Sequence, residues 1–172
     1  MEAKDFTIRK SPCDSPLPEL EVPMINTLVA CLGVEHRKLN GLDMRLAFTA
    51  SRLAGDPAAI TTSQEGLRLW DEIQQGLWSH LQIEEELVFS WGEAHHAISD
   101  ALLETLKNER QEMRKLMVTL RELSSRTDRE QTAGDRSAFA QTLLALAWTL
   151  DSHVERYEGG VLPSILRVLF HK

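Results

Sequence analysis

The sequence is poor in cysteine and has no apolar run long enough to cross a bilayer. Its two cysteines, Cys13 and Cys31, are too few and too far apart for a disulfide-rich scaffold or a paired zinc knuckle. A membrane-spanning helix needs about 20 predominantly apolar residues, and no segment approaches that length. The opening residues, MEAKDFTIRK, are followed by no apolar stretch of the kind found in a secretory signal. We therefore expect a reduced, cytoplasmic protein without a membrane partner.

Basic charge and β-strand patterning are also scarce. The chain has 19 Lys and Arg residues against 26 Asp and Glu residues, which gives a formal net charge of −7. This balance argues against a nucleic-acid partner, because such binding needs a basic face. No segment shows the period-two alternation of β-branched residues that predicts a sheet. Apolar residues make up 42% of the 172 residues, which is enough for one folded domain.

Proline is concentrated near the N-terminus. Four of the six prolines precede residue 24, and these are Pro12, Pro16, Pro18 and Pro23. Proline fixes φ and lacks an amide donor, so residues 1–23 are predicted to form an extended arm. The remaining residues, 24–172, are predicted to form the folded domain.

Apolar residues spaced by three and four predict four long helices. The predicted helices span approximately residues 24–54, 62–91, 98–123 and 135–158. The polar run 124–134 is predicted to be a loop. Gly159-Gly160 is expected to end the fourth helix, and Pro163 to begin a short C-terminal helix over 164–170. Long helices with short links predict an all-α fold, namely an up-down-up-down antiparallel four-helix bundle.

Polar residues interrupt the apolar faces of three of these helices. They are His36, His80, Glu84 and His153. Their spacing from apolar neighbours points all four side chains into one bundle interior. A buried carboxylate needs compensation, and a divalent metal supplies it, because imidazole nitrogen and carboxylate oxygen are normal metal ligands. The spacing is equally compatible with an alternative in which the histidines are hydrogen-bonded core residues and no metal is bound. A haem on one of the histidines is disfavoured, because the carboxylate suits a harder non-haem ion.

Four segments of the chain resemble the hemerythrin-like family of HHE cation-binding proteins. They are LGVEHRKLNGL around His36, LWSHLQIEEELVF around His80, NERQEMRKL around Arg110 and LDSHVERYEGGVLP around His153. The resemblance implies a four-helix bundle that holds a pair of non-haem iron ions bridged by carboxylates. It also implies a protein that binds dioxygen, responds to oxygen, nitric oxide or peroxide, or handles iron in the stress response.

The resemblance assigns ligand roles to most of the interior polar residues. The residues that match one iron's half of the site are His36, His80 and Glu84, with Glu84 as the bridge. His153 matches the fourth-helix histidine of the other half. The carboxylate that should follow is displaced, because Tyr157 stands at the four-residue spacing and Glu158 at the five-residue spacing. An inward Tyr157 could ligate iron or donate a hydrogen bond, but we favour a position at the bundle end with its hydroxyl in water.

The third helix is the clearest departure from the family. Where the family has Glu-His, this chain has Glu109-Arg110, and arginine offers no lone pair to a metal. One interpretation is a single-metal site made of the matched residues, with or without His153. A second makes Glu109 an oxygen ligand and Glu158 a bridge between two ions. In a third, Arg110 pairs with Glu84 or Glu158 and replaces the cation, and a solvated Arg110 on the helix flank is also open.

Three functions are compatible with these residues. We favour a protein that binds or senses a small oxidant or diatomic molecule (dioxygen, nitric oxide or peroxide) at one or two non-haem iron ions. The second is an enzyme that processes peroxide or nitric oxide, for which Tyr157 and Glu158 are the candidate proton donors. The third is a metal-free bundle that acts as an interaction module for a protein partner. Metal content separates the third function from the others, and turnover separates the second from the first.

Overall fold

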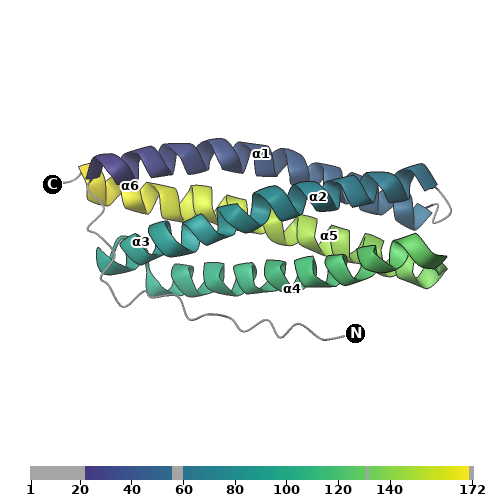
Figure 1. Ribbon diagram of the computed structural model, residues 1–172. Helices are drawn as coiled ribbons and strands as arrows, with labels where there is room; N and C mark the ends of the chain where they lie inside the picture. Colours follow the sequence, from purple (N-terminus) through teal and green to yellow (C-terminus); the bar gives the residue numbers. More distant parts are fainter. Residues whose placement is uncertain (1–21, 56–59, 131, 171–172) are drawn as a thin grey trace, which may run out of the picture.

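The fold consists of four long helical rods. The computed structural model describes residues 22–55, 60–130 and 132–170, and these contain helices and no strand. The elements are α1 (Val22–Gly55), α2 (Ile60–Ile83), the π-helical turn η1 (Glu84–Phe89), α3 (Ser90–Ala94), α4 (Asp100–Glu130), α5 (Ala133–Arg156), the π-helical turn η2 (Tyr157–Val161) and α6 (Leu162–Phe170). η1 and α3 prolong α2, and η2 and α6 prolong α5 (Figure 1). The expected all-α class is therefore confirmed.

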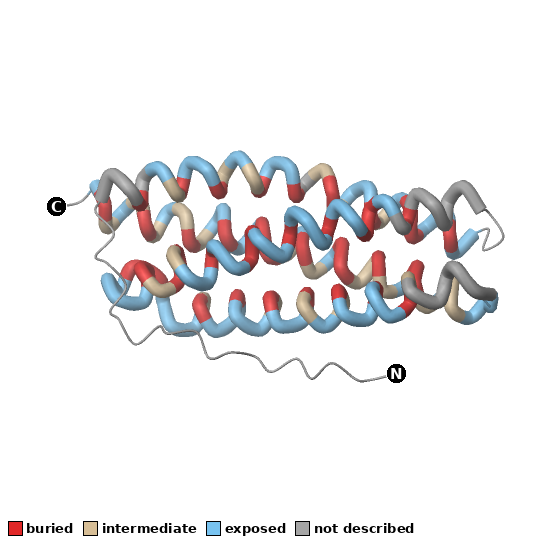
Figure 2. Tube along the Cα trace, viewed as in Figure 1, coloured by how far each residue is buried: buried red, intermediate tan, exposed pale blue. Residues whose placement is uncertain are grey.

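The rods form an up-down-up-down antiparallel bundle. Along the chain, successive rods run in opposite directions, and the chain turns at alternate ends of the bundle (Figure 1). α1 packs against α5 and α2, and α4 packs against the same two helices, so the four rods close a ring. Buried residues line the inward face of each rod (Figure 2). None of the described helices is long and apolar enough to span a membrane.

A polar layer separates two apolar clusters of the described core. One cluster is built around Leu46, Leu77, Leu120 and Leu146, and the other around Leu32, Phe89, Leu106 and Val161. Between them, the buried polar and charged side chains are His36, His80, Glu84, Arg110 and His153. Burial of the apolar face of each rod thus fixes the rotation of that rod about its axis. The polar side chains on the same faces therefore lie together in one layer of the bundle interior.

The structure corrects several predicted boundaries. α1 begins at Val22, and proline is tolerated in a first helical turn; residues 1–21 of the predicted arm lie outside the described part of the chain. The loop predicted over 124–134 is wrong, because α4 continues to Glu130. Polar residues such as Arg, Glu and Gln form helix readily without an apolar stripe. Thr132 then caps α5 through a reciprocal pair of hydrogen bonds with Asp135.

The Gly159-Gly160 pair does not end the fourth rod. Both glycines lie inside η2, and α6 follows without a break. Gly160 instead permits close approach to α4, because a Cβ there would lie 2.7 Å from Leu102 Cδ2. Pro163 is the second residue of α6, next to a π-helical turn in which ordinary α-helical pairing is already interrupted.

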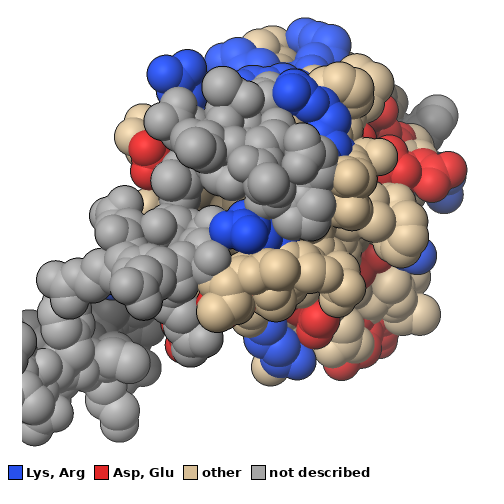
Figure 3. Space-filling model, turned by 90° about the vertical axis from the view of Figure 1, so that its right-hand side faces the viewer, with Lys and Arg blue, Asp and Glu red and all other residues tan. Residues whose placement is uncertain are grey.

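The described surface carries both signs of charge. Seen from the end where α4 meets α5, basic side chains gather along the upper part, whereas acidic ones lie mainly on the right and below (Figure 3). This end of the bundle therefore presents no uniformly basic face. The polar layer, by contrast, holds ion pairs whose side chains are fully buried, His36 with Glu84 and His153 with Glu84.

Candidate metal centre

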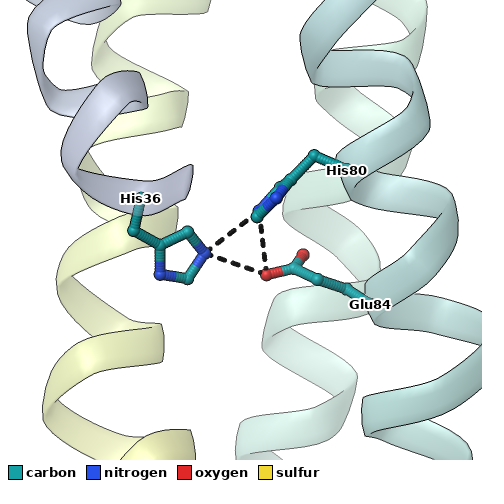
Figure 4. A group of neighbouring side chains, drawn as sticks. All are labelled: His36, His80 and Glu84. Carbon is teal, nitrogen blue, oxygen red and sulfur yellow. Dashed lines mark hydrogen bonds and ion pairs between the residues drawn. The ribbon is translucent and has the colours of Figure 1, made fainter. Parts of the chain in front are cut away.

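Three lone-pair donors converge in the polar layer. His36 Nε2 comes from α1, His80 Nε2 from α2, and Glu84 Oε1 from the first residue of η1 (Figure 4). The two Nε2 atoms are 3.0 Å apart, and Glu84 Oε1 lies 3.1 Å from His36 and 3.2 Å from His80. Ligand atoms that each lie about 2 Å from one metal ion are about 3 Å from one another, which is the spacing of these three atoms. The donor set therefore fits a metal ion.

A carboxylate on α1 fixes the orientation of His80. Glu35 Oε2 lies 2.7 Å from His80 Nδ1. A carboxylate only accepts hydrogen bonds, so Nδ1 carries the proton and Nε2 can offer its lone pair to a metal. Burial lowers the pKa of His80, but Glu84 and Glu35 outweigh it and hold that pKa above its usual value. A proton therefore competes with a metal for Nε2.

Glu84 faces both halves of the polar layer. Its side chain is fully buried; Oε1 lies near His36 and His80, whereas Oε2 accepts a hydrogen bond of 3.0 Å from His153 Nε2. Burial raises the pKa of Glu84, but the three histidines outweigh burial and hold it well below its usual value. Glu84 is therefore an anion placed between two sets of imidazole nitrogens.

Glu109 lies behind His153 and not beside Glu84. Its Oε2 is 3.6 Å from His153 Nδ1, an ion-pair distance too long for a hydrogen bond, and its Oε1 forms an ion pair with Arg156. Glu158 is exposed. Of the six ligand candidates from the sequence, the structure brings His36, His80 and Glu84 into one group and adds His153 through Glu84, while Glu109 and Glu158 remain outside it.

Arg110 is buried but turned away from the converging donors. Its side chain is 2% exposed, so the solvated interpretation is wrong. Nη2 donates to Glu85 Oε2 at 2.7 Å and to the backbone carbonyl of Leu81, and the guanidinium lies over the Phe89 ring. Arg114 donates to the same Glu85 oxygen. Burial lowers the pKa of Arg110, and the charges of Glu85 and Glu84 oppose that shift. Among the described residues, the direct ion pair of Arg110 is therefore with Glu85, and none joins it to Glu84 or Glu158.

Tyr157 lies inside the polar layer. It is 1% exposed, so the expected place at the bundle end with its hydroxyl in water is wrong. Its ring meets the His36 ring edge-on, with centroids 4.3 Å apart and planes at 86°. Burial, with a smaller contribution from the charge of Glu84, raises the pKa of Tyr157 well above its usual value. The residue is therefore a neutral phenol.

Sequence reasoning missed Glu35 and Glu85. Glu35 directly precedes His36 in VEHRK, and an acidic residue beside a candidate ligand is a signal that could have been used. Glu85 follows Glu84 in an acidic run, and the run gave no sign of which helix its second carboxylate would meet. Glu35 acts on the site by contacting His80, and Glu85 acts on it by pairing with Arg110.

The comparison with known protein families gives one match. The family described as Hemerythrin HHE cation binding domain matches residues 34–165, which is more than half of the chain. No curated protein and no solved structure matches the chain. The matched segment contains the His36, His80 and Glu84 group and His153. The chain belongs to the hemerythrin HHE cation-binding family.

Proposed function

We propose that the protein binds one non-haem iron ion at His36, His80 and Glu84, and that this ion binds a small oxidant or diatomic molecule. The observation that carries the proposal is the buried convergence of two imidazole nitrogens and one carboxylate oxygen at 3.0–3.2 Å. Two histidines and one carboxylate with open positions are typical of non-haem iron. A bound iron would supply an open coordination position for dioxygen, nitric oxide or peroxide.

The other half of the polar layer favours a single ion. It offers His153 Nε2 beside Glu84 Oε2, but α4 contributes Arg110, which has no lone pair and faces Glu85. Tyr157 is buried at the same level, where its ring packs edge-on against His36. We assign His153 to orienting Glu84 through its hydrogen bond, as Glu35 orients His80.

Binding or sensing is favoured over turnover. Glu158, one of the two candidate proton donors, is exposed and outside the polar layer. Tyr157 holds its proton too firmly for an efficient acid near neutral pH. A cytoplasmic location, expected from the low cysteine content, would keep the iron reduced, and the response would pass to a protein partner.

The direct test is iron content after anaerobic reconstitution with ferrous iron. We expect about one iron per wild-type chain. His80→Ala should lose most of the iron, because the variant lacks the imidazole that Glu35 orients and therefore the Nε2 donor atom. His96→Asn is the matched control, since His96 is exposed at a positive φ that asparagine tolerates. Nitric oxide added to the ferrous protein should change its absorption spectrum. A wild-type chain that binds no iron would favour the metal-free interaction module.

A further inference from the structure

The Tyr157 hydroxyl has no hydrogen-bond partner among the described residues. The oxygen is buried and the whole residue is 1% exposed. Buried tyrosine hydroxyls normally find a partner, because an unsatisfied buried polar group is costly. A hydroxyl left alone in a packed bundle therefore indicates that its partner is a molecule outside the chain.

The phenol lies beside the proposed iron ligands. Its ring packs edge-on against His36, and Glu84 is near enough for its charge to act on the phenol. Tyr157 is the first residue of η2, just as Glu84 is the first residue of η1. Both π-helical turns thus begin with a residue of the polar layer, an arrangement common where helices carry functional groups.

Nearby protein groups do not serve as the acceptor. Both oxygens of Glu84 already face histidine nitrogens, at 3.1 Å for His36 and 3.0 Å for His153. A hydroxyl that keeps its proton is a hydrogen-bond donor, whereas ligation of a metal would require loss of that proton. The group is thus best suited to donate its proton in a hydrogen bond.

We propose that the Tyr157 hydroxyl donates a hydrogen bond to the small molecule bound at the iron, and thereby selects ligands that carry an acceptor atom. This inference rests on the proposed iron site. Dioxygen, nitric oxide and peroxide all offer such an atom, and a ligand without one would gain nothing from Tyr157. The residue positions the ligand and is not itself a metal ligand.

The test compares wild type with Tyr157→Phe, which removes one oxygen and keeps the ring against His36. Three quantities are measured: iron per chain, the dissociation rate of nitric oxide, and the N–O stretching frequency in H₂O and D₂O. We expect unchanged iron content, dissociation about three- to tenfold faster, and loss of the shift in frequency between the two solvents. Val161→Ala is the control, because Val161 is buried in the same turn but carries no hydroxyl; it should behave as wild type.

The remaining outcomes separate failure of the Tyr157 inference from failure of the proposed iron site. An iron-loaded Tyr157→Phe variant that releases nitric oxide at the wild-type rate and keeps the solvent shift overturns the inference alone. Loss of iron in Tyr157→Phe, with iron retained in Val161→Ala, makes Tyr157 a ligand and also overturns it. A wild-type chain that binds no iron overturns the proposed function, and the inference with it.

Discussion

The two halves of the polar layer use similar residues in opposite ways. In the half formed by α1 and α2, His36, His80 and Glu84 direct their donor atoms at one another (Figure 4). In the half formed by α4 and α5, arginines are paired with carboxylates: Arg110 with Glu85 of η1, which Arg114 also contacts, and Arg156 with Glu109. In the described part of the chain, the ion-pair partners of Glu84 are histidines, whereas Arg110 and Arg156 supply permanent cations on α4 and α5.

This difference shows that a bundle with equivalent rods need not have equivalent sites. All four rods bury polar side chains at the same level. Burial alone therefore does not define a metal site. What distinguishes the first half is that the described partners of its donor atoms are histidines and carboxylates, which suit an added cation, whereas α4 and α5 carry the arginines Arg110 and Arg156.

The largest effect on iron affinity is expected from weakening the contact between Glu35 and His80 in the first half. Glu35→Gln keeps the shape of the side chain but weakens its hold on the His80 Nδ1 proton. Iron affinity should fall by about 10- to 100-fold, as for other partners that orient metal-bound histidines. Chelator competition measures it.

Glu86→Gln is the matched control, because Glu86 is exposed and its carboxylate accepts a hydrogen bond from Gln82. It should keep the wild-type affinity. Equal affinities of wild type and Glu35→Gln would show that His80 is oriented by something other than Glu35.

A smaller and graded effect is expected from pH. Burial lowers the pKa of His80, but Glu84 and Glu35 raise it further, so the net pKa lies above the ordinary value. The imidazolium therefore persists to higher pH than usual, and its proton must leave before Nε2 binds iron. Below that pKa, iron affinity should fall about tenfold for each pH unit. Chelator competition between about pH 8 and pH 6 measures the slope; a flat profile would contradict proton competition at His80.

The smallest effect concerns the second half. Arg110→His removes the buried arginine and introduces an imidazole at the level of the polar layer, so iron should rise from about one to about two ions per chain. Arg114→His is the control, because Arg114 also donates to Glu85 but lies on the partly exposed flank; it should retain one ion. A ratio unchanged by Arg110→His would mean that position 110 does not contribute to the site.

The sequence predicted which polar residues are buried better than it predicted their partners. His36, His80, Glu84 and His153 were placed inside because helical periodicity decides which face a residue occupies, and all four are buried. Periodicity carries no such information where a helix is polar all round, and the extension of α4 to Glu130 was missed for that reason.

Partners across helices depend on side-chain direction and on neighbouring rods. The sequence left Arg110 open between an ion pair with Glu84 or Glu158 and a solvated flank, because its turn toward Glu85 depends on how α4 sits against η1. The inward position of Tyr157 follows from its four-residue spacing after His153 and was missed because Gly159-Gly160 was expected to end the helix there, whereas η2 and α6 continue the rod. The ligand roles of His36, His80, Glu84 and His153 stay predictions that the geometry supports.

The most direct measurement is anomalous X-ray scattering from crystals of the iron-loaded protein. The difference between the two halves predicts one iron peak, placed between His36 Nε2, His80 Nε2 and Glu84 Oε1. It predicts no second peak beside His153. Two peaks of similar height would contradict the assignment of Arg110 as the internal cation of the second half, and no peak in a reconstituted crystal would contradict iron binding itself.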